Sequence, residues 1–471
     1  MKKIEKVYIN GEFVTPHGTE TMELINPANL ELIGTVTLGD EQDALSAIAS
    51  AKKAFKTFSK SSKEERSEYL QRLYEAVTKR VDDLKDATIA EYGATVQRAL
   101  WSNKLGAETF LYFKETLKDF DFVSTVGKSK VVLEPLGVSV IFTPWNSSVG
   151  SICVKLAAAI AAGCTTVIKP SELSAIQTQI LTEAFHEAAL PAGIINVING
   201  RGDILGPVLS SHPDIAKVAF TGSTQVGKII ARSAIDTMKR VTLELGGKSP
   251  NVILDDANLE KAIPLAVNIA FQNNGQACIA GSRLIVPEKL LPKVKELIVK
   301  TVEGMKVGDP TNAATAIGPL ANLKQYQRVQ HFIKSGIAAG AELLIGGEGK
   351  PDGLSEGYYV KPTVFAGVTS DMEISRDEIF GPVLSILTYK TEEEAIELAN
   401  DTIYGLMAYV SSSDMERANR VASQIQAGRV LINVLDHDPF TPFGGYKQSG
   451  VGREGGVYGL KEYLEPKAIL V

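Results

Sequence analysis

The pattern of hydrophobic and polar positions divides the chain into an N-terminal β segment, a helical segment and two α/β segments. Residues 1–40 hold short alternating apolar stretches, and Asn10-Gly11 predicts a two-residue hairpin turn. A second strand pair is expected around Asn26-Pro27. From Asp40 the apolar residues recur at intervals of three to four, which predicts helices. These helices are expected over 40–55, 63–92 and 103–118.

Strands and helices alternate from Val138 to Leu245 and again after Pro250. The segments GVSVIF, CTTVIK, GIINVI and KVAF are apolar and β-branched, with helices expected at 149–162, 175–189, 203–210 and 225–235. The second series has strands NVILDD, SRLIVPE, VLSILTYK and RVLINV, with helices at 260–273, 293–302, 325–338, 391–400 and 413–427. This rhythm predicts two parallel sheets covered on both faces, with ligands at the carboxyl ends of the strands. Residues 120–136 interrupt it as a β excursion.

The composition predicts a soluble globular protein with no nucleic-acid or membrane partner. The chain has 471 residues, of which 44% are hydrophobic and 22% charged, and a formal net charge of −6 gives no basic surface for nucleic acid. The most apolar run, 156–163, is too short to cross a bilayer. Three cysteines and five scattered histidines form neither a disulfide framework nor a metal site. We therefore expect a cytoplasmic protein.

The candidate chemistry centres on Cys278 in FQNNGQACIAGSR. Small residues surround this thiol, so that a substrate carbon can reach the sulfur. Glu244, in LELGG, lies between apolar residues of an expected strand, where burial raises the pKa of a carboxyl group towards that of a useful base. Asn146 ends another strand and can donate its amide to an oxyanion. Taken singly, Asn146 more often indicates an Asx turn and Glu244 a solvated carboxylate, and Cys278 also fits a buried thiol. Together they suit a covalent acyl mechanism.

Two strand ends carry candidate phosphate and ribose contacts. Gly222 to Gly227 follows the strand KVAF and opens a helix whose first N–H groups favour an anion, although the spacing also fits an ordinary strand-to-helix turn. Lys169 and Glu172, in KPSE, either bind ribose hydroxyls or form a surface ion pair.

The ordered set of motifs TPWN, KPSE, FTGST, ELGGKSP, GQAC, EIFGPV and PFGGYKQSG resembles the aldehyde dehydrogenase superfamily from about residue 7 to the C-terminus. The resemblance implies an α/β fold with two parallel-sheet domains and a small β flap used for oligomerisation. The cofactor-binding, Rossmann-like domain is expected at 1–117 and 136–246, the catalytic domain at 247–450, and the flap at 118–135 and 451–471. Flap pairing implies a homodimer or homotetramer.

The resemblance also implies a role for each matching residue. Cys278 is the expected nucleophile, Glu244 the base that activates water, and Asn146, with the Cys278 N–H, the oxyanion hole. The expected cofactor contacts are Thr143, Pro144, Trp145, Lys169, Ser171, Glu172, Gly202, Gly222, Ser223, Gly227, Leu245, Glu378 and Phe380. The reaction implied is oxidation of an aldehyde to a carboxylic acid through a thiohemiacetal and a thioester.

Several alternatives stay open at this stage. Glu244 favours hydrolysis over transfer of the acyl group to coenzyme A, and Glu172 favours NAD over NADP, which remains possible. Ser147-Ser148-Val149 replaces the Phe-Pro of many relatives and predicts a wider or more polar aldehyde tunnel. Loop residues Asp436, His437, Asp438 and Phe440 are expected near its mouth, with Phe443 and Phe271 as apolar walls. A histidine-assisted thiol hydrolase and a non-catalytic family member are the rival functions.

Overall fold

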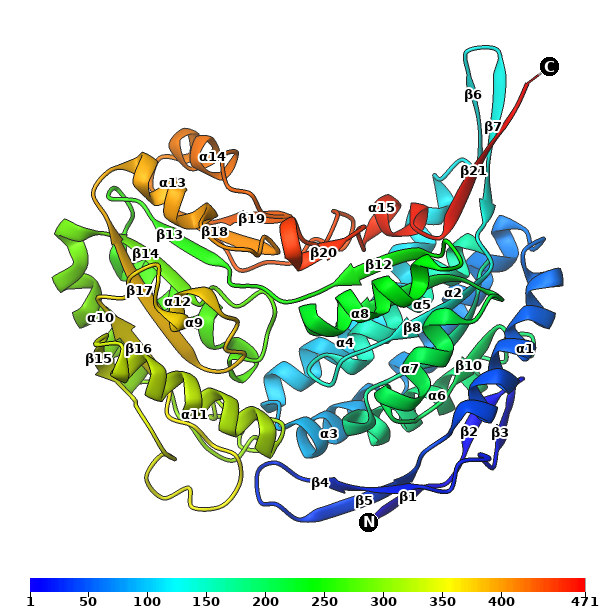
Figure 1. Ribbon diagram of the computed structural model, residues 1–471, viewed down its shortest axis with the longest axis horizontal. Helices are drawn as coiled ribbons and strands as arrows, with labels where there is room; N and C mark the ends of the chain where they lie inside the picture. The colour runs from blue at the N-terminus through cyan, green and yellow to red at the C-terminus, as the bar shows by residue number, and fades with distance from the viewer. Residues whose placement is uncertain (471) are drawn as a thin grey trace.

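Two large sheets, each with helices on both faces, organise the computed structural model, which describes residues 1–470 (Figure 1). The first sheet has the order β20-β12-β11-β8-β9-β10-β2-β3. Its strands are β20 (Gly450–Val451), β12 (Arg240–Glu244), β11 (Ile215–Thr221), β8 (Val138–Phe142), β9 (Thr165–Lys169), β10 (Ile195–Val197), β2 (Val7–Ile9) and β3 (Glu12–Val14). The strands from β12 to β10 are parallel, as the alternation of strands and helices predicts.

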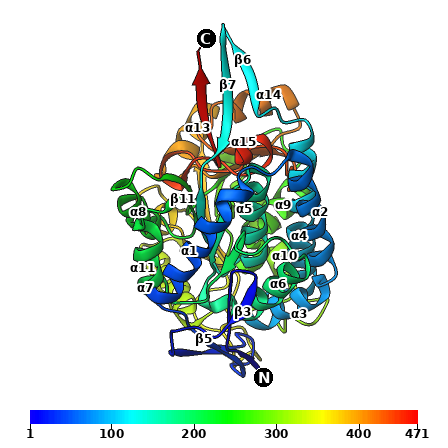
Figure 2. The same ribbon diagram turned by 90° about the vertical axis from the view of Figure 1, so that its right-hand side faces the viewer.

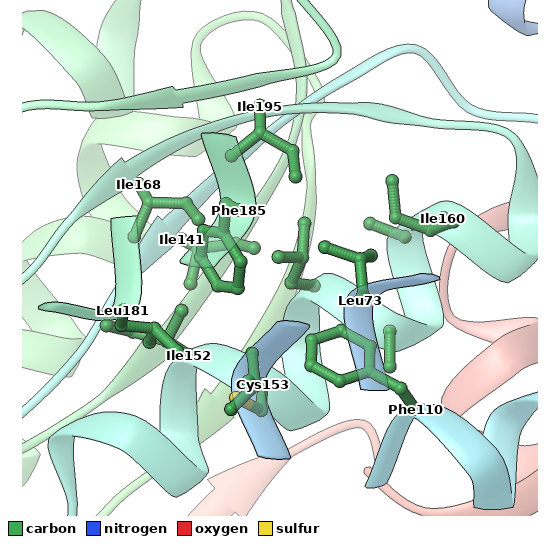
Figure 3. Packing of buried hydrophobic residues seen from close by; sticks show 14 of the residues in the cluster. Leu73, Phe110, Ile141, Ile152, Cys153, Ile160, Ile168, Leu181, Phe185 and Ile195 are labelled. Atoms are coloured by element: carbon green, nitrogen blue, oxygen red, sulfur yellow. The ribbon is translucent and has the colours of Figure 1, made fainter. Parts of the chain in front are cut away.

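Side chains of β8 alternate between the two hydrophobic cores that cover this sheet. Val138, Val140 and Phe142 pack with helices α1 (Glu41–Phe58), α7 (Gly202–Ser211) and α8 (Thr224–Ile235). Ile141 points into the opposite core, where Figure 3 shows it beside Ile152 and Phe185. That core is built by α2 (Lys63–Thr78), α3 (Val81–Tyr92), α4 (Val96–Lys118), α5 (Ser148–Ala162) and α6 (Ala175–Glu187). The strands are buried on both faces, which explains their continuous apolar sequences.

The second sheet has the order β15-β16-β17-β14-β13-β18-β19, and all neighbours except β15 and β16 are parallel. Its strands are β13 (Pro250–Ile253), β14 (Arg283–Pro287), β15 (Glu342–Ile345), β16 (Thr363–Ala366), β17 (Val383–Tyr389), β18 (Met407–Ser411) and β19 (Arg429–Ile432). The helices around it are α9 (Leu259–Phe271), α10 (Leu291–Glu303), α11 (Leu323–Ala338), α12 (Glu373–Arg376), α13 (Glu392–Asn400) and α14 (Met415–Ala422).

Two small three-stranded sheets complete the fold. One joins β1 (Lys2–Ile4), β5 (Leu32–Thr37) and β4 (Thr21–Ile25). The other joins β21 (Leu464–Ile469), β7 (Ser129–Pro135) and β6 (Val123–Val126), and it projects from the body of the molecule in both views (Figures 1 and 2). Short helix α15 (Gly456–Lys461) leads into β21. Val471, the last residue of the predicted flap range, lies outside the described residues.

The main differences from the predicted elements concern boundaries. The helix predicted over 63–92 is two helices that meet at Arg80, whose guanidinium pairs with Asp83 and Glu183 and so anchors the break against α6. No glycine or proline lies between the two helices, and the apolar periodicity continues across the break. The sequence therefore gives no sign of it. Helix α4 begins at Val96, before the predicted start, and α14 ends at Ala422. The strand pair around Asn26-Pro27 and the Asn10-Gly11 hairpin are confirmed; both turn residues have positive φ.

Candidate active site

A cavity of about 1260 Å³ is lined by residues that follow strands of both large sheets. Of the predicted site residues, those that line it are Asn146, Glu244, Cys278, Pro144, Trp145, Gly222, Ser223, Leu245, Glu378 and Phe380. Six predicted cofactor contacts lie outside this lining, namely Thr143, Lys169, Ser171, Glu172, Gly202 and Gly227. The cavity therefore brings together all three predicted catalytic residues and about half of the predicted cofactor contacts.

Cys278 follows a loop whose backbone is left-handed at three successive residues. Asn273, Asn274 and Gly275 have φ values of 55°, 59° and 71°. Asparagine tolerates this region, and a Cβ on Gly275 would lie 2.2 Å from the Gly381 carbonyl carbon, so only glycine fits there. The Asn274 amide donates to the carbonyls of Gly93 and Pro319 and accepts the Gly318 N–H at 2.7 Å. These contacts hold the loop and therefore the position of the thiol.

Asn146 lies directly against this loop. Its Nδ2 donates a hydrogen bond of 2.9 Å to the Gln276 carbonyl, and the Asn273 amide donates to the Asn146 carbonyl at 3.2 Å. One hydrogen of the Asn146 amide is used in this contact, and the second remains available for another acceptor. The arrangement fixes the amide beside the cysteine loop.

The Cys278 thiol is surrounded by groups that disfavour its ionisation. Burial and, after it, the carboxylates of Glu378 and Glu244 raise its pKa to about 12, although backbone N–H groups of Cys278 and Ile279 act in the opposite direction. Without a ligand, the neutral thiol therefore dominates at neutral pH. Formation of a thiolate requires a base or a bound positive charge.

Glu244 ends β12 and is only 3% exposed. Among residues 1–470 neither of its carboxylate oxygens has a hydrogen-bond partner. Burial raises its pKa well above the ordinary value, the nearby Glu454 carboxylate raises it further, and Lys155, Arg453 and Arg429 oppose this. A buried carboxylate without partners is suited to accept a proton.

Lys155 and Glu454 form a buried ion pair that the sequence analysis missed. The Lys155 Nζ lies 2.6 Å from a Glu454 carboxylate oxygen and donates to the Thr221 hydroxyl at 2.6 Å. Their side chains are 2% and 13% exposed. A lysine within the apolar run of α5 was the available signal, because a buried lysine requires a partner.

In the same cavity, Ser223 is the N-cap of α8, and its hydroxyl accepts the Val226 N–H. The surface beside it is built from small residues: a Cβ on Gly246 would lie 2.6 Å from a Glu378 carboxylate oxygen. The Glu378 carboxylate accepts the Gly247 N–H at 2.9 Å, and burial raises its pKa to about 7. Helix-start N–H groups, a glycine surface and a carboxylate are the groups that a dinucleotide requires.

The six remaining predicted contacts lie nearby in the fold. The Lys169 Nζ lies 2.9 Å from one Glu172 oxygen, and the other oxygen accepts the Gly202 N–H at 3.0 Å, at the start of α7. Ser171 caps a 3₁₀ turn, η1 (Glu172–Ser174). Thr143 is buried, and a Cβ on Gly227 would meet Leu245 at 2.4 Å. Gly227 thus serves helix–strand packing.

The predicted tunnel walls are only partly correct. Ser147, Phe443 and His437 line the cavity, whereas Ser148 is buried and is not part of its lining. Phe271 was predicted to line the substrate tunnel. Its side chain is instead fully buried in the hydrophobic core to which α9 and α10 contribute. The apolar periodicity of α9 turns its side chain inward.

The loop carboxylates also do not reach the cavity lining. Asp436 and Asp438 accept the N–H groups of His437 and Phe440, which are local loop contacts. Phe440 packs against Tyr112, with ring centroids 5.6 Å apart. The loop therefore offers no acidic site for a cationic substrate.

One face of α4 forms a wall of the cavity that the sequence analysis did not identify. Arg98, Leu105, Gly106, Thr109, Tyr112 and Phe113 line it. Their spacing of three to four residues is that of one helix face. The same spacing predicts a core-facing stripe, so the pattern alone gives no sign of a ligand surface.

Comparison with known proteins agrees with this geometry. The chain belongs to the aldehyde dehydrogenase family, whose model matches residues 13–469. It is 45% identical to 3-succinoylsemialdehyde-pyridine dehydrogenase from a Pseudomonas species, over 100% of this chain and 99% of that protein. The predicted family is confirmed.

Solved structures show the same fold. Aldehyde dehydrogenase C of Pseudomonas syringae, crystallised as a cysteine-to-alanine mutant with NAD+ and octanal, has a TM-score of 0.98 at 43% identity, covering 99% of this chain and 96% of that one. Betaine aldehyde dehydrogenase of Staphylococcus aureus, crystallised with NAD+, has a TM-score of 0.96 at 36% identity, covering 99% and 95%. The predicted fold class is confirmed. Among residues 1–470 no helix is both long enough and apolar enough to span a bilayer.

Proposed function

We propose that this protein oxidises an aldehyde to the carboxylic acid with NAD as the hydride acceptor. The observation that carries the proposal is the convergence of Cys278, Glu244 and Asn146 on one cavity that is also lined by the groups a dinucleotide requires. Family membership and the NAD+ complexes of similar structures support it. The rival function, a thiol hydrolase that uses Cys278 with a histidine, lacks support. Cys278 and His437 both line the cavity, but within residues 1–470 no hydrogen bond joins their side chains, and His437 lies instead beside Arg429.

In the proposed cycle Cys278 is the nucleophile. Its thiolate adds to the aldehyde carbon, a C–S bond forms, and the carbonyl oxygen becomes an oxyanion that the second hydrogen of the Asn146 amide and the Cys278 N–H stabilise. The chemistry that bound NAD would supply is acceptance of the hydride from this thiohemiacetal, so that Cys278 would carry an acyl thioester. Glu244 then removes a proton from water, the hydroxide attacks the acyl carbon, and the C–S bond breaks to release the acid and the thiolate.

The residues present fit the cofactor. The first N–H groups of α8, with Gly222 and Ser223, would hold the pyrophosphate, and Glu378 would bind the nicotinamide ribose. Lys169 and Glu172 would bind the adenosine ribose beside Gly202. Glu172 favours NAD because a carboxylate repels a 2′-phosphate, whereas Lys169 leaves NADP possible. Thr143, Pro144, Trp145, Ser171, Gly227, Leu245 and Phe380 would complete the site.

The organisation of the chain follows from the same proposal. The division at 1–117 and 136–246, at 247–450, and at 118–135 and 451–471 is supported by the two large sheets and by the pairing of β21 with β7. Residues 450–451 pair with β12, which connects the last segment to the first sheet. The projecting strands would assemble a homodimer or homotetramer in the cytoplasm.

The proposal is tested by the appearance of NADH with purified protein and a panel of aliphatic, aromatic and acidic aldehydes. We expect turnover with NAD, and slower turnover with NADP. A rate that requires added coenzyme A would indicate acyl transfer instead of hydrolysis. No turnover together with no binding of NAD would contradict the proposal and favour a non-catalytic family member.

The pH dependence provides a separate prediction, on Glu454→Gln. Glu244 must be deprotonated to act, so the deacylation rate falls as the pH falls through its pKa. Because the Glu454 charge raises that pKa and Lys155 lowers it, removal of Glu454 leaves Lys155 unopposed. We expect the acidic limb of kcat to move by about one pH unit to lower pH. The measurement is kcat against pH, with the exposed Glu465→Gln as control; an acidic limb that does not move would contradict it.

A further inference from the structure

Arg98 is a cation inside the cavity with no counter-ion of its own. It lies on the cavity face of α4, and its guanidinium stacks over the Trp101 ring at 4.5 Å from the centroid. Within residues 1–470 its side chain forms no salt bridge and donates no hydrogen bond to a protein acceptor. Arginine stays protonated and carries five N–H donors. The stacked face is therefore covered, while the edge that carries the donors is free.

Three of the carboxylates that line the cavity are engaged elsewhere. Glu91 caps the start of α6, accepting the N–H groups of Ile176 at 2.6 Å and Gln177 at 2.9 Å. Glu454 pairs with Lys155, and Glu378 accepts the Gly247 N–H. None of them neutralises Arg98, and no carboxylate is among the groups that act on it appreciably within the described residues.

Arg98 belongs to the reacting end of the cavity. The positive charge of Arg98 interacts with the negative charge of an ionised Cys278 thiol and with that of an ionised Tyr92 hydroxyl. Ser102, one helical turn after Arg98, shares a small cavity with Trp145, Asn146 and Ser147. The helix that carries Arg98 is thus placed beside the segment that carries the oxyanion donor.

The wall next to this segment is polar. Ser147 and Ser151 are one turn apart at the start of α5, and both line the cavity. Within residues 1–470 neither hydroxyl is used in a hydrogen bond to another side chain. Free hydroxyls beside a free guanidinium suit an anionic oxygen ligand better than a hydrocarbon chain.

Burial without a partner has an energetic consequence. Burial lowers the pKa of Arg98, which means that its charge is partly removed from water without a compensating anion in the protein. A ligand carboxylate would supply that anion, and guanidinium and carboxylate groups match in a planar, two-point contact. An uncharged ligand would leave the desolvation cost of the Arg98 charge uncompensated.

We propose that Arg98 binds the carboxylate of an acidic aldehyde, so that the preferred substrates are semialdehydes of dicarboxylic acids, with the aldehyde at Cys278 and the carboxylate at Arg98. This inference rests on the proposed aldehyde oxidation. It assigns Arg98 a role in substrate specificity, outside the chemical steps carried by Cys278, Glu244 and Asn146.

The test compares 4-oxobutanoate with its methyl ester, which has the same four-carbon chain but carries an uncharged ester in place of the carboxylate. For the wild-type enzyme we expect kcat/KM to be about 10- to 100-fold higher for 4-oxobutanoate, as for a hydrogen bond to a charged group. Arg98→Met is expected to remove this preference, mainly through a higher KM for 4-oxobutanoate, and to affect the ester less than the acid. Arg98→Lys is expected to restore part of it.

Lys104→Met is the matched control, because Lys104 is on the same helix, largely exposed, and outside the cavity lining. A wild-type enzyme that oxidises the ester as well as the acid would overturn the inference and leave the proposed function standing. Equal losses on both substrates in Arg98→Met would also overturn it, since Arg98 would then act on the thiol or on stability. A raised KM for NAD with both substrates would overturn it by placing Arg98 at the cofactor.

Discussion

Cys278→Ala is expected to abolish aldehyde oxidation, with a loss of at least about 10⁴-fold in kcat. The alanine keeps the Cβ and the left-handed loop before it, so the cavity is preserved and only the atom that forms the C–S bond is removed. Binding of NAD is expected to persist, because none of the proposed cofactor contacts comes from the Cys278 side chain. The measurements are NADH formation and NAD binding by the same preparation.

The other cysteines provide the control for this variant. Cys153 and Cys164 are fully buried away from the cavity, in the core between the first sheet and α2, α4 and α5, and burial raises the pKa of both thiols. Cys164→Ala should therefore retain activity and lose only stability, by about 1 kcal/mol. Normal turnover by Cys278→Ala would assign the nucleophile to another residue.

Glu244→Gln is expected to stall the enzyme after hydride transfer. Glutamine keeps the shape of the side chain but cannot accept a proton from water, so the thioester should accumulate. We expect a burst of about one NADH per active site, followed by a steady rate lowered about 10²- to 10⁴-fold. The measurement is rapid-mixing NADH absorbance, with detection of the acylated protein by mass.

The burst itself should not be slowed, for an electrostatic reason. The Glu244 carboxylate raises the pKa of Cys278, so its replacement by a neutral amide lowers that pKa and favours the thiolate. Glu260→Gln is the control, since Glu260 is exposed on α9 and does not line the cavity. A steady rate in Glu244→Gln equal to that of the wild type would remove Glu244 from the role of base.

The sequence alone was sufficient for the architecture and for the residues proposed to react. Parallel strands that are buried on both faces are rich in apolar and β-branched residues, so β8, β9 and β11 are evident from the sequence, although they also contain Ser139, Thr165 and Lys217. Asn10-Gly11 predicts its turn because both residues tolerate positive φ. Cys278, Glu244 and Asn146 lie within distinctive local motifs at strand or loop ends, where the fold class places ligands.

The tertiary structure decided how segments far apart in the chain meet. Lys155 and Arg98 lie in helices whose sequence patterns predict only core-facing stripes. Only the tertiary structure places Glu454 beside Lys155 and exposes Arg98 to the cavity. Phe271 has the aromatic character of a tunnel wall, yet the orientation of α9 turns it into the core. Apolar periodicity fixes which face of a helix is buried, but a core and a ligand cavity bury the same residue types, so only packing distinguishes them.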